Sequence, residues 1–171
     1  HYPESFEPGL SDEVVYLGHH RLTDRFTQDN LDIEIGKLLL APTRTYAPVI
    51  RLLLKTMPDA VKGLIHCSGG GQTKCMKYLP SPMHIIKDNL FTAPPVFSLI
   101  QQNSGADNRE MYQVFNMGHR MEIFTSAKDA EGVIAIATSL GVDARVIGRV
   151  EASTQQKLTL QVKDEQILFE Y

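Results

Sequence analysis

Three consecutive glycines, Gly69, Gly70 and Gly71, constrain the fold of this chain more than any other feature of its sequence. They follow an apolar run at residues 63–67, which predicts a short buried strand, and precede a helical run at residues 73–79. Residues without a Cβ allow the backbone to turn sharply and to approach a ligand closely. The helix that follows would direct free N–H groups and the positive end of its dipole at that ligand. The pattern predicts a strand, turn and helix that bind a phosphate or nucleotide, or else only a tight turn.

Three polar side chains flank the glycines and are candidates for the chemistry of this site. His66 ends the predicted strand and faces the turn, where it could donate to a phosphate or act as a general acid or base, because imidazole titrates near neutrality. Thr73 and Lys74 lie in the first turn of the predicted helix and add a hydroxyl and a cation. The alternatives are a buried, hydrogen-bonded histidine and ordinary solvated surface.

Several well-known motifs do not match this region. Lys74 occupies the position where a dinucleotide-binding fingerprint needs its third glycine, and the segment does not match the P-loop pattern. Cys67 and Cys75 have a spacing that no usual structural zinc site uses, so we expect no metal site in this chain. Ser68 is no esterase nucleophile, because His66 occupies the position of the first glycine of that motif.

Two further groups of residues are candidates for binding an anion. Asn116, Gly118 and Arg120 precede a predicted strand, and an arginine can bind a phosphate with two parallel hydrogen bonds. A turn and one more surface charge are the alternative interpretation. Thr43 and Arg44 follow a proline and are expected to open the first helix, whose N-terminus could hold an anion. The alternative for this pair is a helix cap.

The order of the apolar patterns along the chain indicates an α+β fold. We expect a mixed β-sheet of about six strands, covered by about four helices on one face. Residues 1–30 contain prolines and scattered acids, with only residues 14–17 apolar enough for a strand, and are expected to form an extended arm or linker. The body is expected to span residues 31–171. The expected strands lie near residues 31–40, 63–67, 83–86, 121–124, 144–150, 158–162 and 167–171, and the helical runs near residues 46–56, 73–79, 96–101, 108–114 and 126–141.

Composition and charge exclude several classes of function. The 171 residues include 17 Lys and Arg against 20 Asp and Glu, and the formal net charge of −3 argues against binding to a nucleic acid. No apolar run approaches the ~18 residues that a membrane-spanning helix needs, so we expect no membrane partner. Two cysteines are too few for a disulfide framework and indicate a reducing compartment, the cytoplasm. The chain does not begin with Met, so we expect it to be part of a longer protein.

Four segments in a fixed order resemble the C-terminal half of phosphoribosylformylglycinamidine cyclo-ligase, also called aminoimidazole ribonucleotide (AIR) synthetase. The resemblance covers roughly residues 36–151 and includes the closing VIGRV at residues 146–150. The FNMG run at residues 115–118 favours this family over its relatives. The four segments are LAPTRTY (40–46), GLIHCSGGG (63–71), APPVF (93–97) and MYQVFNMG (111–118).

The resemblance implies an ATP-dependent ring closure of formylglycinamidine ribonucleotide to AIR, with release of ADP and phosphate. It implies that ATP and Mg²⁺ are held mainly by an N-terminal domain outside this chain, that this domain is a partner of the chain, and that the whole protein is a homodimer. The isolated chain is then expected to be inactive. Alternatives are a non-catalytic module that binds a small ligand or assists assembly, and another ATP-dependent enzyme of the same superfamily, such as formylglycinamidine ribonucleotide synthetase.

The sequence departs from the family pattern at three points. Ser68 replaces the usual Thr and keeps the hydroxyl, which makes it a candidate phosphate ligand beside the glycines. Cys75 stands where Asn is usual, so the amide contact expected there is in doubt. His119 and Arg120 replace a small apolar residue and a glycine, so we expect this loop to carry extra positive charge or to have a different backbone.

Overall fold

The computed structural model describes residue 9, residues 19–28 and residues 30–170 of the chain. The strand expected at residues 14–17 lies outside the described residues. The strands are β1 (Arg25–Gln28), β2 (Leu31–Glu34), β3 (Gly63–His66), β4 (Met83–Lys87), β5 (Met121–Phe124), β6 (Gly148–Ala152), β7 (Lys157–Val162) and β8 (Glu165–Glu170). The helices are α2 (Ile35–Leu39), α3 (Ala47–Thr56), α4 (Pro95–Ser104), α5 (Asn108–Val114) and α6 (Ala130–Ser139), with the 3-10 helices η2 (Pro58–Ala60), η3 (Gly71–Tyr78) and η4 (Ala127–Asp129).

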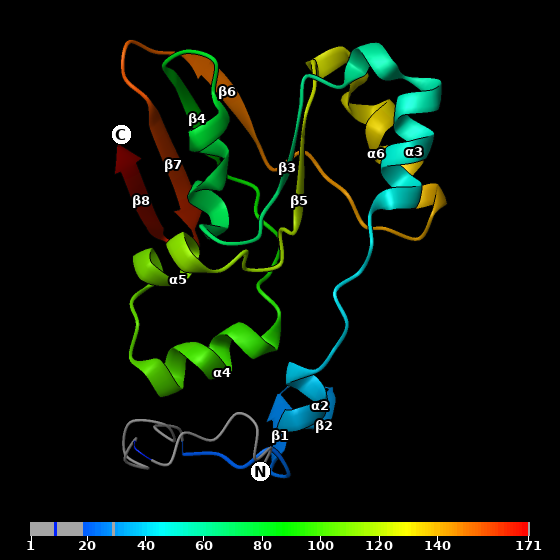
Figure 1. The fold of residues 1–171 in the computed structure, drawn as a ribbon. Helices are drawn as coiled ribbons and strands as arrows, with labels where there is room; N and C mark the ends of the chain where they lie inside the picture. Colours follow the sequence, from blue (N-terminus) through cyan, green and yellow to red (C-terminus); the bar gives the residue numbers. More distant parts are fainter. Residues whose placement is uncertain (1–8, 10–18, 29, 171) are drawn as a thin grey trace.

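The largest sheet has four strands in the order β6-β4-β7-β8 and is mixed, because β4 and β7 run parallel while the other pairs are antiparallel. Its apolar side chains alternate along β7, so that Leu158 and Leu160 are fully buried on one face. The helices η3 and α5 lie over that face (Figure 1) and contribute Met76 and Met111 to the same core. The expected α+β class, with helices on one face of a mixed sheet, is confirmed.

A second and smaller core lies beside the antiparallel pair β3 and β5. The helices α3 and α6 pack together next to this pair (Figure 1). Leu53 of α3, Ala60 of η2 and Val133 of α6 form the buried centre. Full burial of one leucine stabilises a fold by roughly 1.5–3 kcal/mol, so Leu53 anchors α3 in this position. Because β3 and β5 lie between the two cores, their ends bring residues from both halves of the body together.

The strands number more than the expected six and form three separate sheets. The segment expected as one strand at residues 31–40 is a strand only to Glu34, and residues 35–39 form the short helix α2. The pairing of β2 with β1 ends where Glu34 lies opposite Arg25. Beyond this point the N–H of Gly36 donates to the carbonyl of Leu22, which is not part of a strand. The pairing of β1 with β2 crosses the boundary at residue 30 that we expected between arm and body.

The strand expected at residues 144–150 begins later, at Gly148. At Gly148 the backbones of β6 and β4 lie so close that a Cβ would collide with the carbonyl of Ile86. The pairing of these strands therefore starts at a glycine, which has no Cβ. The other strands and helices lie within a few residues of their expected positions. In the part of the chain that the structure describes, no helix has the length and apolar character needed to cross a membrane.

Candidate functional site

The glycine turn joins the end of β3 to the start of η3, as the sequence predicted. All three glycines have left-handed backbones, with φ angles of 39° at Gly69, 95° at Gly70 and 47° at Gly71. A Cβ on Gly71 would lie 2.6 Å from the carbonyl oxygen of Tyr112 and would overlap that of Phe115, whereas a Cβ on Gly69 would meet nothing within 4 Å. The turn is therefore packed against α5 at one end and open at the other.

Backbone hydrogen bonds leave part of this turn free for a ligand. The carbonyl of Gly70 accepts bonds from the N–H of Thr73 at 3.0 Å and from its hydroxyl at 2.8 Å. Among the described residues, the N–H groups of Gly69 and Gly70 donate no hydrogen bond. Thr73 therefore stabilises the turn from within, while two adjacent N–H groups remain available at its open end. Such consecutive N–H groups form a concave site for an anion.

Lys74 lies across this turn and places a cation at its open end. Its Nζ donates to the carbonyl oxygen of Ser68 at 2.8 Å and to the Ser68 hydroxyl at 3.0 Å. The ammonium group thus links the two ends of the turn. The structure brings together Ser68, the glycines and Lys74, which we predicted as ligands of one anion.

His66 is exposed at the end of β3, so the alternative of a buried, hydrogen-bonded histidine is wrong. Its backbone pairs with Met121 of β5, and its ring lies 6.4 Å, edge to face, from the ring of Tyr46. The segment that leads into α3 therefore passes beside the end of β3. An exposed imidazole in this place is free to donate to a ligand.

Thr43 and Arg44 do not open the first helix, and this expectation is wrong. The helix α3 begins at Ala47, with Pro48 in its first turn, where a proline costs no hydrogen bond. Arg44 instead donates a 2.6 Å hydrogen bond to the carbonyl of Gly141, just beyond the end of α6. The arginine thus ties the segment before α3 to the end of α6, and Thr43 is exposed beside it.

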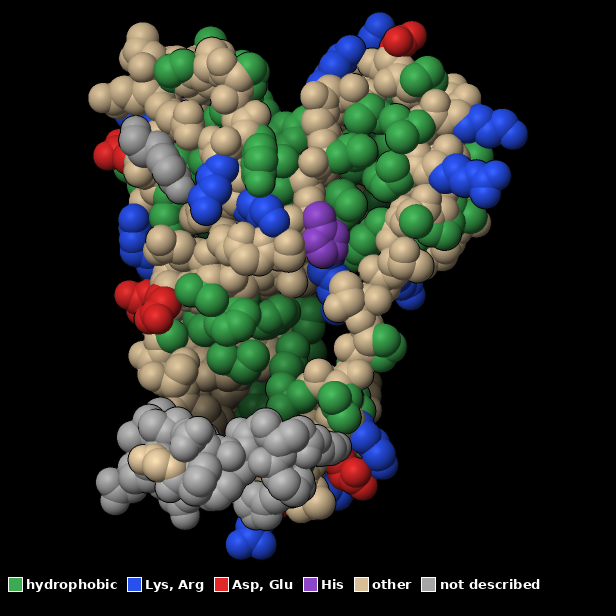
Figure 2. All heavy atoms as spheres, in the orientation of Figure 1, with side chains coloured by type: hydrophobic (Ala, Val, Ile, Leu, Met, Phe, Trp, Pro, Cys, Tyr) green, Lys and Arg blue, Asp and Glu red, His purple; other side chains and the backbone are tan. Residues whose placement is uncertain are grey.

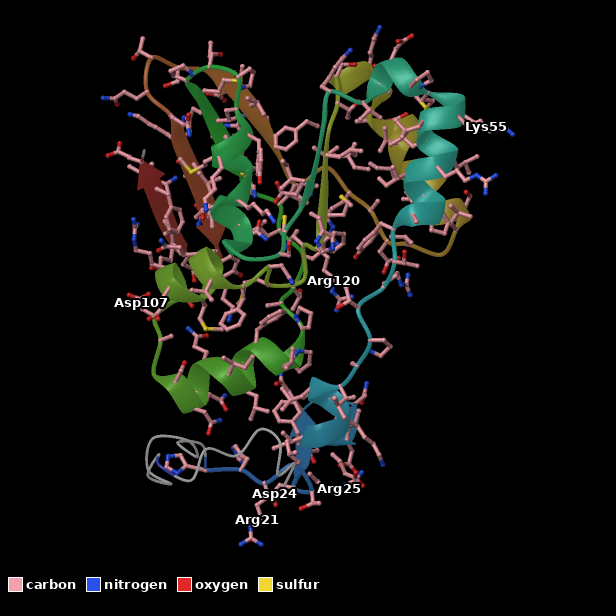
Figure 3. All side chains as sticks on the ribbon, in the orientation of Figure 1. Arg21, Asp24, Arg25, Lys55, Asp107 and Arg120 are labelled. Carbon is pink, nitrogen blue, oxygen red and sulfur yellow. The ribbon has the colours of Figure 1, made fainter. Side chains whose placement is uncertain are left out.

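The turn at residues 116–118 lies against the glycine turn, and one glutamine connects the two. Asn116 accepts the N–H of Gly118 on its side-chain oxygen at 2.9 Å, and its carbonyl accepts the side-chain amide of Gln72 at 2.6 Å. Gly118 has a φ of 98°, and a Cβ there would lie 2.8 Å from Pro94 Cδ. Arg120 follows at the N-terminal end of β5 (Figure 3). Its carbonyl accepts the N–H of Cys67 at 2.8 Å. The two predicted binding segments are therefore neighbours.

A buried polar cluster behind these turns was missed in the sequence. Lys87 of β4 donates from Nζ to Glu122 of β5 at 2.5 Å, and to the carbonyl and side-chain oxygens of Gln72 at 3.0 and 3.1 Å. Burial, the largest single effect, lowers the pKa of Lys87, but the charge and hydrogen bond of Glu122 together with Cys75 and Cys67 outweigh it and raise the pKa, so the lysine is charged. One charged residue in each of two mostly apolar strands, β4 and β5, was the signal that could have revealed this pair.

The buried titratable groups near the site are chemically inert. Burial, followed by the nearby charge of Glu122, raises the pKa of the Cys67 thiol, and burial raises the pKa of Cys75 to about 11. Burial, followed by the charge of Lys87, lowers the pKa of His119 to about 4, and its Nε2 accepts the N–H of Phe91 at 2.8 Å. Neither thiol serves as a nucleophile at neutral pH, and His119 is a neutral structural group.

The surface around the site carries cations between the two halves of the body. Figure 2 shows Lys and Arg side chains and one histidine on the central part of this face, with apolar side chains on either side. In the described ranges 19–28 and 30–170, no three His, Cys, Asp or Glu side chains gather in a way that could hold a metal ion. The site therefore suits an anionic ligand bound by N–H groups and cations.

The family model of the AIR synthase related protein, C-terminal domain, matches residues 13–161, which is most of the chain. The chain belongs to this family. Of the curated relatives of this AIR synthase related domain, the phosphoribosylformylglycinamidine cyclo-ligase of Syntrophus aciditrophicus is 33% identical over 133 residues, which are 77% of this chain and 38% of that protein. The same enzyme of Methanococcus vannielii is 37% identical over 134 residues, 78% of this chain and 37% of that protein. The chain thus spans less than two fifths of the length of these relatives.

Solved structures support the AIR synthase related fold. The hydrogenase maturation protein HypE of E. coli superimposes with a TM-score of 0.53 at 21% identity, over 80% of this chain and 45% of that chain. A chain of a HypE-HypF complex gives a TM-score of 0.54 at 18% identity, over 80% of this chain and 48% of its own length. At these identities the likeness concerns the fold alone.

Proposed function

We propose that this chain supplies one wall of the active site of an ATP-dependent cyclo-ligase, which converts formylglycinamidine ribonucleotide to AIR, ADP and phosphate in purine biosynthesis. The names of the curated relatives support a ligase of this kind. The observation that carries the proposal is the pair of unbonded N–H groups at Gly69 and Gly70, beside the ammonium of Lys74. Together they form a site for a phosphate group of the substrate.

The proposed reaction transfers the γ-phosphoryl group of ATP to the formyl amide oxygen of the substrate, with ADP as leaving group. The amidine nitrogen then attacks the activated carbon, the C–O bond breaks, and phosphate leaves as the five-membered ring closes. Such steps depend on positioning and on neutralisation of phosphate charge more than on a protein nucleophile. The inert buried thiols of Cys67 and Cys75 agree with this chemistry.

Each residue of the site has one task in this proposal. The N–H groups of Gly69 and Gly70, with the Ser68 hydroxyl, bind the phosphate oxygens, and Lys74 neutralises their charge. His66 is exposed at the end of β3 and donates a proton or a hydrogen bond to the leaving oxygen. Two further residues form the border of the site, namely Arg120 and Asn116, the latter through its side-chain amide.

ATP and Mg²⁺ are assigned in this proposal to another part of the protein. The described residues offer no acidic cluster for Mg²⁺, so we derive no step through the metal on this chain. The relatives are more than twice as long as their matched regions, which leaves room for an ATP-binding domain as the partner of this chain. We further propose that the whole protein is a cytoplasmic homodimer.

A phosphate-release assay tests the proposal with two samples, the 171 residues alone and the same residues joined to the ATP-binding domain that this proposal assigns to the whole protein. Both receive ATP, Mg²⁺ and formylglycinamidine ribonucleotide. We expect phosphate release and formation of AIR only from the joined protein, and about a hundredfold less from its Lys74→Met variant. Turnover by the isolated chain would overturn the two-domain account. A joined protein that binds a ligand but never forms AIR would favour the non-catalytic alternative.

A further inference from the structure

The polar side chains of Lys87, Gln72 and Glu122 form a closed cluster between β4, β5 and η3. The side chains of Lys87 and Glu122 are only 2% and 5% exposed, and Gln72 is fully buried. The ammonium of Lys87 has three protons, and three oxygens accept from it, namely one of Glu122 and two of Gln72. The ammonium of Lys87 is therefore fully hydrogen-bonded and has no proton left for a ligand.

The same glutamine joins the two segments that form the proposed anion site. Gln72 follows the glycine turn directly, and its Nε2 donates to the carbonyl of Asn116 at 2.6 Å. Gly71 packs without a Cβ against the carbonyls of Tyr112 and Phe115, just before Asn116. Gln72 accepts from Lys87 on one side and donates to Asn116 on the other, so it connects the buried cation to both turns.

We propose that Lys87 is a positioning residue of the anion site, which acts through Gln72 to hold the glycine turn and the turn at residues 116–118 in one fixed arrangement. This inference rests on the proposed function for its ligand. The charge of Lys87 is balanced by Glu122 and lies behind the turns. Lys87 therefore fixes the position of the two turns and does not itself attract the anion. A buried polar network acts in this way when its members are hydrogen-bonded, and here the Lys87 ammonium and the Gln72 side chain both have their partners.

Replacement of Gln72 by methionine tests this role directly. The variant Gln72→Met keeps the size of the side chain and the Lys87–Glu122 pair, but loses the amide that joins the two turns. We expect the hydrogen-bonded backbone amides of Thr73, Gly118 and His119 to exchange with solvent about tenfold faster, while β7 and β8 keep their wild-type rates. The matched control is Gln101→Met, which removes an amide that bonds Ala106 and Asn108 in the α4–α5 connection. The control variant should leave the exchange rates of the amides in both turns unchanged.

Binding of inorganic phosphate separates positioning from mere stabilisation. At a temperature where both proteins are fully folded, we expect Gln72→Met to bind phosphate about tenfold more weakly than wild type, as is usual when a group supporting a ligand site is removed. The double variant Lys87→Met/Glu122→Met removes both charges together, and proteins often tolerate such a replacement of a buried ion pair by apolar residues. We expect this variant to show the same loss of phosphate affinity as Gln72→Met. Wild-type affinity in either folded variant would overturn the inference.

Hydrogen exchange of the wild-type protein decides the question even if the variants fail to fold. If Lys87 and Gln72 hold the two turns as one unit, the hydrogen-bonded amides of Thr73, Gly118 and His119 share one opening free energy and one urea dependence. Independent opening of the two turns would overturn the inference. Absence of phosphate binding by the wild type would instead remove the proposed function, while the exchange data would still report on the coupling.

Discussion

Lys87 Nζ lies 2.5 Å from Glu122 Oε1, and this pair connects the four-stranded sheet with the antiparallel pair β3–β5. Lys87 ends β4 and Glu122 lies in β5, so no backbone hydrogen bond joins their two sheets at this point. The pair, together with Gln72, fixes the distance between the two sheets. The site described above lies over this junction.

Loss of Lys87 alone should be strongly destabilising. The variant Lys87→Met leaves the carboxylate of Glu122 buried without its cation, which typically costs roughly 3–5 kcal/mol. We expect the free energy of unfolding in urea to fall by that amount at pH 7. The control is Lys157→Met on the adjacent strand β7, where the ion pair with Glu170 is 3.7 Å long and partly exposed. Such a pair contributes at most about 1 kcal/mol, so a similar loss in both variants would contradict this account.

Two glycines of the same turn should respond differently to alanine. Both Gly69 and Gly71 have positive φ, so either substitution strains the backbone by roughly 1–2 kcal/mol. Only at Gly71 does the new methyl group also meet backbone carbonyls of α5 and its C-terminal end. We expect Gly71→Ala to lower the free energy of unfolding by at least about 2 kcal/mol more than Gly69→Ala. Equal losses in urea unfolding would show that the turn does not pack against α5.

His119 should make the protein less stable in mild acid. Its pKa in the folded state is about 4, lowered by burial and by the charge of Lys87, against 6.5 in the unfolded chain. The unfolded state therefore binds the extra proton first, and the stability present above pH 6.5 falls as the pH drops from 6.5 to 4. The largest loss is about 3 kcal/mol, which is 2.5 pKa units at 1.36 kcal/mol each.

The His119→Gln variant isolates this contribution from that of the carboxylates. Glutamine keeps an oxygen that can accept the N–H of Phe91 but does not titrate. We expect the unfolding free energy of the variant, followed in urea between pH 7.5 and 4, to decline less steeply than that of the wild type. Parallel curves for the two proteins would mean that His119 is solvated in the native state.

The two thiols should be unreactive in the native protein. Cys67 and Cys75 are buried, and their raised pKa values keep both thiols protonated at pH 8. We expect a disulfide reagent to label them at least about a hundredfold more slowly than a free cysteine. Labelling should become fast once denaturant is added. Fast labelling of either cysteine without denaturant would place it at an exposed site.

Much of the fold was predictable because the apolar patterns are local. Apolar and polar residues alternate in β7 and β8, and this pattern indicates which face of each strand is buried. The helical spacing of Val49 and Leu53 indicates the buried face of α3 in the same way. The partition into three sheets was not predictable, since it depends on pairing between distant segments. The short helix α2 was also missed, because its apolar residues continue those of β2 without a break.

The site was predicted in part, for similar reasons. The glycine turn and Lys74 are adjacent in sequence, and their geometry follows from local rules. Arg44 was placed wrongly because its partner, the carbonyl of Gly141, lies 97 positions away. The link from Lys87 to Gln72 and Glu122 was missed because three separate segments contribute one side chain each.

Titration of the 171-residue chain with inorganic phosphate, followed through its backbone amide NMR signals, tests the central claim most directly. The account predicts saturable shifts at Gly69, Gly70 and the neighbouring residues 71–74, with smaller shifts at residues 116–120, and a clear weakening in the Lys74→Met variant. Shifts that never saturate, or that scatter over surface lysines while Gly69 and Gly70 stay unchanged, would contradict the assignment of this turn as the phosphate site.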